Sequence, residues 1–381
     1  MRISESSDVQ AWRRTVREFV DEEFGVEYFR KKYQNREYPH ELYDAVVDRG
    51  WLGLLIPEAY GGEGAGHVKH VVLLEELGTY GYDFGIPVLL SGSVAENIVR
   101  NGTDEQIERM VPPLLDGKRR FTVGVTEPDG GSDAASLQTR AERDDGTYIV
   151  NGEKTYQSAV VSQDTVVNLY VRTDPGGSKY EGISTLLVPT ELEGVTVEEL
   201  PFVTRKAAGT SRLQFDDVVV PATNLVGDSG DGWQMMNEHL VTEHTHMAAV
   251  MVGNARTAVQ TALSHATEHE RFGQPIAEFQ TIKHRLADLQ TEVEAARLLV
   301  YRAASKLDEG DRSRRLAAQA KLKAGEVLQE VTQEGMQILG GQGFLSENDM
   351  ERYWREGKSA TIAGGTSEIQ RSVIAASLLD Q

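Results

Sequence analysis

The stretch FTVGVTEPDGGSDA, residues 121–134, marks the point where the chain turns from helical to extended patterning. Its first half alternates β-branched and small residues, which predicts a β-strand, and its second half is a glycine-rich turn. The NH groups of that turn, the hydroxyls of Thr126 and Ser132, and the close backbone approach that its glycines allow suit a flat polar ligand. A β-turn that carries polar side chains has the same spacing, so the stretch alone leaves both interpretations open.

Around this stretch, residues 119–225 have the pattern of short β-strands. Runs of β-branched and aromatic residues alternate with turn clusters such as DDG and DPGG. No helix of crossover length separates the runs, which argues against a parallel doubly wound sheet and predicts a small all-β domain. The further runs are GTYIVNGEK (146–154), DTVVNLYVR (164–172), ISTLLVP (183–189) and SRLQFDDVVVP (211–221).

The segments on either side of the strands have helical periodicity. Before them, VKHVVLLEELGTYG (68–81) predicts a helix that ends on glycine, and LLIPEAYGGEGAG (54–66) predicts a loop. After them, a long helix is expected from Trp233 to about Glu270, followed by helices over 276–308 and 312–339 and shorter ones within 346–378. The short connections favour an antiparallel bundle, and the order is α, then β, then α. This is an α+β protein with more than one domain.

The composition excludes several classes of protein. The 381 residues include no Cys, which excludes disulfide frameworks, thiol nucleophiles and Cys-ligated zinc. The net charge of −20 argues against nucleic-acid binding, which depends on neutralising phosphates. No apolar run reaches the roughly 18 residues of a membrane span, and the first residues lack the apolar core of a secretory signal. We therefore expect a cytoplasmic protein.

The run EHLVTEHTH (238–246) groups acidic and histidine side chains on a predicted helix. His239, Glu243 and His246 are spaced i, i+4 and i+7 and therefore share one face, and the last two have the E-x-x-H spacing of di-iron bundle proteins. A di-iron site needs a second helical pair, and the only other match, at 37–40, contains a proline. We expect a polar helix face at this place and no metal.

Glu243 also interrupts an apolar stripe of the same helix. Met236, Leu240, Met247 and Val250 fall at helical spacing on either side of it. A carboxylate in that place would be partly desolvated, which raises its pKa toward the range useful to a general base. The alternative is that the Glu243 side chain lies at the edge of the stripe and its carboxylate reaches water.

Seven motifs, in order along nearly the whole chain, resemble those of the acyl-CoA dehydrogenase family. Each motif alone is weak, but seven in order are specific. The family's architecture implies an N-terminal helical domain over 1–118, a central β-barrel over 119–225 and a C-terminal four-helix bundle over 226–381. The motifs are LGLLIPEAYGGEG (52–64), VGVTEPDGGSDA (123–134), YIVNGEK (148–154), FDDVVVP (215–221), RFGQPIAEFQ (271–280), QILGGQGF (337–344) and GGTSEIQR (364–371).

The resemblance implies bound FAD and a homotetramer built as a dimer of dimers. Tyr156 takes the place of a Trp that commonly covers the flavin, and Ser158 that of a Thr bonded to the ring. One group of residues would line the flavin ring, and a second would hold the adenosine and pyrophosphate end, partly from a neighbouring subunit. The first group is Val125, Thr126, Ser132, Tyr156 and Ser158; the second is Arg271, Phe272, Gln280, Gln337, Gly340 and Gly341, with Thr366 and Glu368 in the last FAD-contacting motif.

One departure from the family's pattern concerns the catalytic base. Many members carry a catalytic Glu directly before the final Gly-Thr, where this chain has Gly364 before Gly365. A minority, resembling isovaleryl-CoA and long-chain dehydrogenases, carries the Glu on the long helix, ten residues before the residue matching Gly253. That position is Glu243, the carboxylate that the apolar stripe singles out independently. The resemblance therefore implies that Glu243 is the catalytic base.

Further departures concern the CoA part of the substrate. Val241 takes the place of an Asp that contacts the acyl arm, and His244 that of the Arg after the Glu. His269 takes the place of an Arg before the Phe-Gly pair, with Arg271 beside it as a replacement phosphate contact. The residues implied at the substrate are Ser132, Val241, His244, Gly364 and Gly365.

The expected reaction is FAD-dependent α,β-dehydrogenation of an acyl-CoA thioester. Glu243 would remove the α-proton while flavin N5 accepts a hydride from the β-carbon, and electron-transfer flavoprotein would accept the electrons. Two alternatives remain open. A flavin oxidase or monooxygenase with a non-CoA substrate is favoured by Val241 and His244, and a non-catalytic partner subunit of a mixed dehydrogenase is suggested by Gly364.

Overall fold

The computed structural model describes residues 6–160 and 164–379. They form two compact units. One comprises the residues up to 33, residues 67–85 and those from 244 onward, and the other comprises residues 34–66 and 86–243. Helix α7 (Gly232–Glu268) begins in the second unit and continues in the first, with the division between Glu243 and His244.

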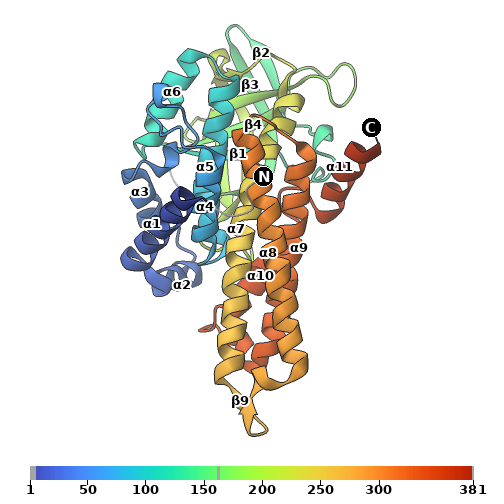
Figure 1. Ribbon diagram of the computed structural model, residues 1–381. Helices are drawn as coiled ribbons and strands as arrows, with labels where there is room; N and C mark the ends of the chain where they lie inside the picture. Colours follow the sequence, from blue (N-terminus) through green and yellow to red (C-terminus); the bar gives the residue numbers. More distant parts are fainter. Residues whose placement is uncertain (1–5, 161–163, 380–381) are drawn as a thin grey trace. The chain divides into compact units, whose positions relative to one another are not determined.

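The first unit is helical, and its long helices confirm those expected from the periodicity (Figure 1). Helix α8 packs on α9, and α9 also packs on α10 and α11. No helix of the part of the chain described here is long and apolar enough to cross a membrane. The helices of this unit besides α7 are α1 (Ser7–Glu23), α2 (Gly25–Asn35), α4 (His67–Gly78), α8 (Gln280–Asp308), α9 (Arg314–Leu339), α10 (Met350–Ala360) and α11 (Ser367–Leu379).

Helices α8 and α9 are antiparallel neighbours joined by a short connection, so the start of α8 and the end of α9 lie at the same end of the pair (Figure 1). A two-stranded hairpin of β9 (Glu270–Arg271) and β10 (Gln274–Pro275) precedes α8 at that end. At 1.5 Å per residue α8 is about 43 Å long. The two ends of the pair are therefore too far apart for one side chain to reach both.

Helix α4 lies against α7 at backbone contact, because each contributes a glycine. A Cβ on Gly253 would lie 1.9 Å from the carbonyl oxygen of Glu75, and one on Gly78 would lie 2.3 Å from that of Val250. Any side chain at either position would push the helices apart. The close approach brings charged groups of both helices together in the interior.

A completely buried carboxylate, that of Glu75 on α4, is surrounded by three guanidinium groups. Arg13 Nη2 lies 3.0 Å from Glu75 Oε2, and Arg256 Nη1 and Arg297 Nε lie 2.5 and 2.9 Å from Oε1. The hydroxyl of Tyr301 donates to Oε2 over 2.5 Å. Burial alone would raise the pKa of Glu75, but the three arginines outweigh it and lower that pKa to about 2. Glu75 therefore stays ionised in the core.

Three histidines are buried together where α4 meets α7. His67 Nδ1 lies 3.3 Å from His246 Nε2, and the ring centroids of His70 and His246 are 4.6 Å apart. His70 is fully buried, and its two ring nitrogens have no hydrogen-bond partner among residues 6–160 and 164–379. Burial, and then the neighbouring His67, lower the pKa of His70 to about 3.

We expect the protein to lose stability as the pH falls from about 6.5 toward 3. Over that range His70 stays neutral in the folded state, whereas the unfolded chain binds a proton at its ordinary pKa of 6.5. Because the unfolded state then holds more protons, the free energy of unfolding decreases by about 3 kcal/mol at pH 4. Urea midpoints of the wild type and of His70→Leu, measured at pH 7 and pH 4, test this. The variant should lose less stability on acidification, and an equal loss in both proteins would contradict the assignment.

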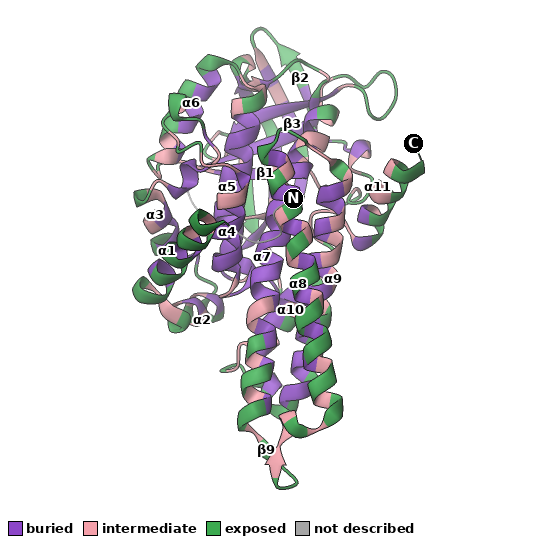
Figure 2. Ribbon diagram, viewed as in Figure 1, coloured by how far each residue is buried: buried purple, intermediate pink, exposed green. Residues whose placement is uncertain are grey.

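The second unit is built on an eight-stranded mixed sheet in the order β6-β7-β3-β2-β4-β5-β8, with β1 beside β4 (Figure 1). Strands β1 and β4 are parallel, whereas β3 with β7 and β4 with β5 are antiparallel. Apolar residues of these strands form its core (Figure 2). The strands are β1 (Arg120–Gly124), β2 (Arg140–Asp144), β3 (Thr147–Ser158), β4 (Thr165–Arg172), β5 (Ile183–Pro189), β6 (Val195–Glu199), β7 (Thr210–Pro221) and β8 (Leu225–Val226).

The five strands expected from alternating apolar residues are confirmed, but β2 and β6 were not predicted. Their sequences, RAERD and VTVEE, are charged, and most of their residues are exposed. Both strands join the sheet by backbone pairing but bury no apolar face. Their sequences therefore lack the alternation of apolar and polar residues from which a strand is predicted. Helices α3 (His40–Asp48), α6 (Asp104–Leu115) and most of α5 (Tyr82–Asn101) complete this unit.

Candidate active site

Glu243 lies on α7, and its carboxylate-bearing side chain is only 14% exposed. On the same face of the helix, Met236 belongs with Tyr170 of β4 to one buried apolar cluster, and Leu240 packs against that cluster. Burial and, with it, the negative charge of Glu243 raise the pKa of the Tyr170 hydroxyl, which therefore stays protonated. The partial burial expected from the apolar stripe is confirmed.

His239 and Glu243 meet as the i, i+4 spacing predicts. His239 Nε2 lies 3.2 Å from Glu243 Oε2, and the histidine side chain is 1% exposed. The third member of the expected face, His246, contacts His67 and His70 in the first unit. Among the residues described, no cluster of three or more His, Asp and Glu side chains could hold a metal ion.

Four residues expected at a flavin ring lie on two adjacent backbone segments of the second unit. The segment after β1 carries Val125 and Thr126, and the end of β3 carries Tyr156 and Ser158. The NH of Thr155 donates to the carbonyl of Thr126 over 2.8 Å, and the Thr122 hydroxyl donates to the carbonyl of Ser158 over 2.8 Å. The structure therefore brings these predicted residues together.

Tyr156 has an unusual backbone conformation for a residue that is not glycine. Its φ is +67°, and its side chain is 55% exposed, with the ring centroid 5.7 Å from that of Phe202. Bulky residues in the left-handed region are costly and concentrate at functional sites. An exposed aromatic ring held in this way suits stacking on a planar ligand.

Sequence reasoning missed a buried ion pair that fixes the segment carrying Val125. Lys154 Nζ lies 2.8 Å from Glu127 Oε1 and donates to the carbonyl of Val125 over 2.9 Å. The Glu127 carboxylate also accepts from the NH groups of Gln138 and Thr139 over 2.6 and 2.8 Å. Burial lowers the pKa of Lys154 to about 8, although the pairing with Glu127 opposes it. Lys154 occupies an inward position of a predicted strand, and a buried lysine is rare unless it is paired, so this position could have indicated the ion pair.

Ser132 lies in the glycine-rich turn, where it is exposed. The turn is closed by paired backbone hydrogen bonds between Glu127 and Gly130, of 3.2 and 3.1 Å. Next to Ser132, the carboxylate of Asp133 lies 2.7 Å from Lys179 Nζ. The Ser132 hydroxyl thus sits on an anchored loop, open to a ligand.

In the first unit, the turn at Gly364 and Gly365 lies against α7 just after Glu243. Both glycines have positive φ, of +64° and +82°. A Cβ on Gly364 would lie 2.6 Å from Met247 Sδ and 4.0 Å from His244 Cδ2, so a larger side chain would displace Met247. The carbonyl of Gly365 accepts from Lys321 Nζ over 2.5 Å. Three predicted substrate residues, His244, Gly364 and Gly365, are therefore close together, and position 364 has no room for a glutamate as packed.

Of the other residues expected at the cofactor or substrate, Thr366 directly precedes α11 and Glu368 lies in its first turn. The Thr366 hydroxyl accepts from the NH of Ile369 over 3.3 Å, and Glu368 is exposed in the first helical turn. Val241 of the second unit and His244 are 3% and 8% exposed. Neither offers the charged group that the family's pattern places there.

The remaining predicted cofactor residues gather at the hairpin end of α8 and α9, which is exposed (Figure 2). Phe272, at the hairpin, is 96% exposed, and a Cβ on Gly340 or Gly341 would meet nothing within 4 Å. Lys321, which binds Gly365, precedes the end of α9 by about five turns, or about 27 Å. The structure therefore separates this group from the Gly364 turn. The group consists of Arg271, Phe272, Gln280, Gln337, Gly340 and Gly341.

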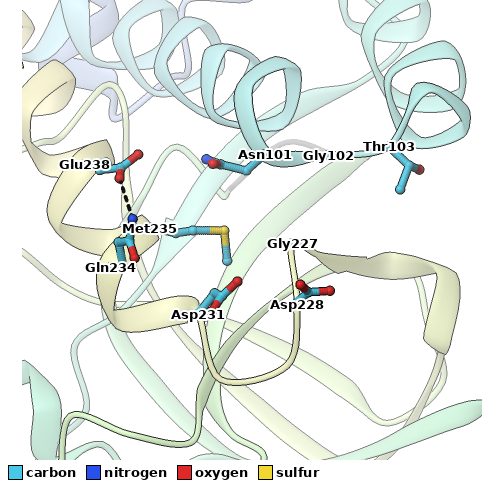
Figure 3. Close-up of a pocket in the computed structure, with 9 residues that line it drawn as sticks. All are labelled: Asn101, Gly102, Thr103, Gly227, Asp228, Asp231, Gln234, Met235 and Glu238. Carbon is cyan, nitrogen blue, oxygen red and sulfur yellow. Dashed lines mark hydrogen bonds between the residues drawn. The ribbon is translucent and has the colours of Figure 1, made fainter.

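A pocket of about 400 Å³ lies in the second unit, between the end of α5 and the first turns of α7 (Figure 3). Carboxylates of Asp228, Asp231 and Glu238 line it, and Gln234 Nε2 donates to Glu238 over 3.0 Å. Asp231 lies beside the start of α7, where the helix dipole favours negative charge. The acidic lining does not suit the phosphates of a nucleotide. The other lining residues are Asn101, Gly102, Thr103, Gly227 and Met235.

Comparison with known proteins gives matches along the whole chain. The N-terminal, middle and C-terminal domains of acyl-CoA dehydrogenase match residues 6–118, 122–218 and 230–379. A subunit of the caffeyl-CoA reductase–Etf complex of Acetobacterium woodii is 32% identical over 372 residues, or 96% of this chain and 97% of that protein. The butyryl-CoA dehydrogenase structure from Megasphaera elsdenii is 30% identical with a TM-score of 0.94, covering 100% of both chains. A glutaryl-CoA dehydrogenase from Mycobacterium smegmatis, in complex with FADH2, is 26% identical with a TM-score of 0.91, covering 100% of this chain and 96% of that one.

Proposed function

Because the chain belongs to the acyl-CoA dehydrogenase family of FAD-dependent enzymes, we propose that it catalyses the α,β-dehydrogenation of an acyl-CoA thioester with Glu243 as the base. One observation carries the assignment of the base. Glu243 is a carboxylate with a side chain only 14% exposed, set in an apolar stripe, whereas Met247 fills the space beside Gly364. The placement resembles that of isovaleryl-CoA and long-chain dehydrogenases.

The residues present fit FAD. Tyr156 offers an exposed ring in a strained backbone, and the adjacent segment offers Val125 and Thr126. Ser132 and Ser158 would supply hydroxyls at the ring, and Thr366 and Glu368 would hold another part of the cofactor. When bound, FAD supplies the acceptor for the hydride that leaves the β-carbon.

The residues of this chain then have separate tasks. Glu243 takes the α-proton onto a carboxylate oxygen, which requires the carboxylate to be ionised and aimed at the α-carbon. A thioester's α-proton is too weakly acidic for a free carboxylate, so hydrogen-bond donors must stabilise the enolate oxygen. Ser132, His244 and Val241 would contact the acyl and CoA portions.

The separation of the predicted cofactor residues supports a homo-oligomer. The group with Gln337 and Phe272 is about 27 Å along α9 from the residue that binds Gly365. One group would therefore serve the FAD of its own subunit and the other that of a second copy, which is consistent with a homotetramer. Sedimentation of the FAD-loaded protein as a dimer or tetramer supports this, and an FAD-loaded monomer contradicts it.

Electron-transfer flavoprotein is the proposed electron acceptor, because a relative of similar length is named as a subunit of an Etf complex. The apolar Val241 and the buried His244 favour a second candidate, a flavin oxidase with a non-CoA substrate. The rate at which air reoxidises the substrate-reduced protein separates the two. Slow reoxidation by air with fast reoxidation by electron-transfer flavoprotein supports the dehydrogenase, and rapid reoxidation by air supports the oxidase.

Anaerobic titration of the yellow protein with a panel of acyl-CoAs tests the proposed reaction. A substrate should bleach the flavin absorption stoichiometrically and yield the enoyl-CoA. If straight, branched and aromatic acyl-CoAs all left the absorption unchanged, the proposed function would be wrong. The same panel identifies the acyl chain that this enzyme prefers.

Lys154→Met is expected to weaken FAD binding about tenfold. The change removes the donor to the Val125 carbonyl and the partner of Glu127, so the segment beside the flavin loses its anchor. Titration of the apoprotein with FAD, followed by quenching of flavin fluorescence, measures the dissociation constant. Arg143→Met, at an exposed position of β2, is the matched control and should bind FAD as the wild type does. Equal affinity in a folded Lys154→Met protein would contradict the anchoring role.

A further inference from the structure

A buried lysine of the first unit, Lys321 on α9, has no task in the proposed reaction. The residue is 1% exposed, and its Nζ donates to the carbonyl oxygen of Gly365 over 2.5 Å. Lysines are rarely buried to this extent, because removing an ammonium group from water costs free energy that bound acceptors must offset. The turn that carries Gly365 is therefore bound from the interior by a cation.

A second buried donor reaches the same turn from α11. Gln370 is 0% exposed, and its Nε2 donates to the carbonyl oxygens of Gly364 and Gly365 over 3.2 and 3.3 Å. Helix α11 packs on α9, so the two donors come from neighbouring helices (Figure 1). Both successive carbonyls of the turn consequently face the interior of the unit.

The direction of these carbonyls fixes the direction of the NH groups that follow them. In a trans peptide unit the C=O and the N–H point to opposite sides of the chain. The NH groups of Gly365 and Thr366 therefore point away from Lys321 and Gln370. Within the part of the chain that the structure describes, neither NH group donates to another residue, and both Gly365 and Thr366 are partly exposed. The turn thus presents two adjacent donors on its outer side.

The two glycines leave this turn conformationally free unless contacts from outside fix it. Gly364 and Gly365 have φ of +64° and +82°, and glycine adopts such values about as readily as negative ones. A single arrangement of the NH groups therefore depends on groups beyond the turn. The buried donors of α9 and α11 hold both carbonyls and supply that restriction.

We propose that Lys321 is a positioning residue for FAD, fixing the turn so that the NH groups of Gly365 and Thr366 face the cofactor. The inference rests on the proposed function, in which Thr366 holds part of FAD. Lys321 acts through the turn and not by contact with the cofactor. Without it the turn exchanges among the conformations that glycine permits. If the competent conformation falls to about a tenth of the population, the apparent dissociation constant of FAD rises about tenfold.

Replacement of Lys321 by methionine tests this role, because methionine has an unbranched side chain of similar length but cannot donate a hydrogen bond. The carbonyl of Gly365 keeps Gln370 as a donor in Lys321→Met. Lys323→Met is the matched control on the same helix. Lys323 is two residues further along, faces another direction, is partly exposed and pairs with Glu292 of α8.

Two measurements on the same apoproteins separate positioning from a structural role. Titration with FAD, followed by quenching of flavin fluorescence, gives the dissociation constant, and urea unfolding gives the stability. We expect Lys321→Met to bind FAD about tenfold more weakly with a urea midpoint close to that of the wild type, because apolar groups often replace buried charges at little cost. Lys323→Met should match the wild type in both. A purely structural role predicts the reverse, a lower midpoint with unchanged affinity.

Unchanged FAD affinity in a folded Lys321→Met protein would overturn the positioning role, and so would equal weakening in Lys323→Met. If Lys321→Met does not fold, Gln370→Met asks the same question, because it removes the donor that both carbonyls share. Its affinity for FAD should also fall about tenfold, and wild-type affinity would overturn the inference. A wild type that binds FAD but is bleached by no acyl-CoA would instead overturn the proposed function and leave the role of Lys321 standing.

Discussion

Glu243→Gln is expected to lower kcat by about 10²-fold to 10⁴-fold while FAD stays bound. Glutamine keeps the size and shape of the side chain but cannot take a proton from the α-carbon, and this is the range that general bases contribute. Position 364 offers no substitute, because Gly364 carries no side chain that could accept a proton. Turnover with an artificial electron acceptor gives kcat, and the visible spectrum gives the FAD content of the same samples.

Glu238→Gln is the matched control for this experiment. Glu238 lies on α7 five residues before Glu243, in the acidic pocket, where it binds Gln234 and Arg100 (Figure 3). Its loss should leave kcat within about threefold of the wild type. Retention of more than about a tenth of the activity by Glu243→Gln, with FAD bound, would show that another group removes the proton.

Glu75→Gln is expected to destabilise the protein by about 3–5 kcal/mol. The change removes the carboxylate that Arg13, Arg256 and Arg297 share, and it leaves the buried Glu76 beside Arg13 and Arg256. Breaking a buried ion pair by removing one partner costs this much, because the opposite charge that stays in the interior loses stabilisation there. Urea unfolding at pH 7, followed by circular dichroism, measures the change.

The pH dependence of the same variant supplies the internal check. Because the pKa of Glu75 lies near 2 in the folded state, its stabilisation is complete above about pH 4.5 and is lost as the pH falls toward 2. Glu75→Gln should therefore lose less stability than the wild type on acidification. Arg17→Met, which removes a half-exposed partner of Glu76, should cost less than about 1 kcal/mol. If Glu75→Gln also lowered the free energy of unfolding by less than about 1 kcal/mol, the stabilising role of Glu75 among the three arginines would be contradicted.

The elements of the fold were predictable where their sequences carry a clear apolar pattern. Helix α7 has apolar residues at helical spacing, and strands β4 and β5, nearly all of whose residues are buried, are short runs rich in apolar residues; all were predicted. β2 and β6 were missed because their exposed, charged side chains carry no such signal. Helix α8 begins at Gln280 and not at 276, because residues Ile276–Glu278 form a 3-10 turn that keeps the helical spacing.

Contacts between residues of the candidate site were predictable only where the two residues are close in the sequence. His239 and Glu243 are neighbours by helical geometry, so their shared face could be predicted. The burial of Glu243 depends on contacts between α7 and the sheet, where Met236 of the same helix face joins Tyr170 in one buried cluster. The pairing of Lys154 with Glu127 joins two strand segments, and no local pattern encodes such a contact.

The ion pairs of Glu75 could not be predicted either, because its partners are distant in the sequence. Its partners come from α1, α7 and α8. Helices α1 and α8 each carry several arginines that the sequence alone cannot rank, and nothing local in α7 shows that its single arginine, Arg256, faces Glu75. The separation of the cofactor residues also came only from the structure, because the antiparallel course of α8 and α9 decides which motifs share an end.

The central claim, that Glu243 starts oxidation of an acyl-CoA, is tested most directly by anaerobic rapid mixing. Wild type and Glu243→Gln, both loaded with FAD, are mixed with the acyl-CoA that titrates best, and the flavin absorption is followed. The wild type should bleach in a single turnover, and the variant should bind the substrate yet bleach at least about 100-fold more slowly. Bleaching of both proteins at the same rate would contradict the claim.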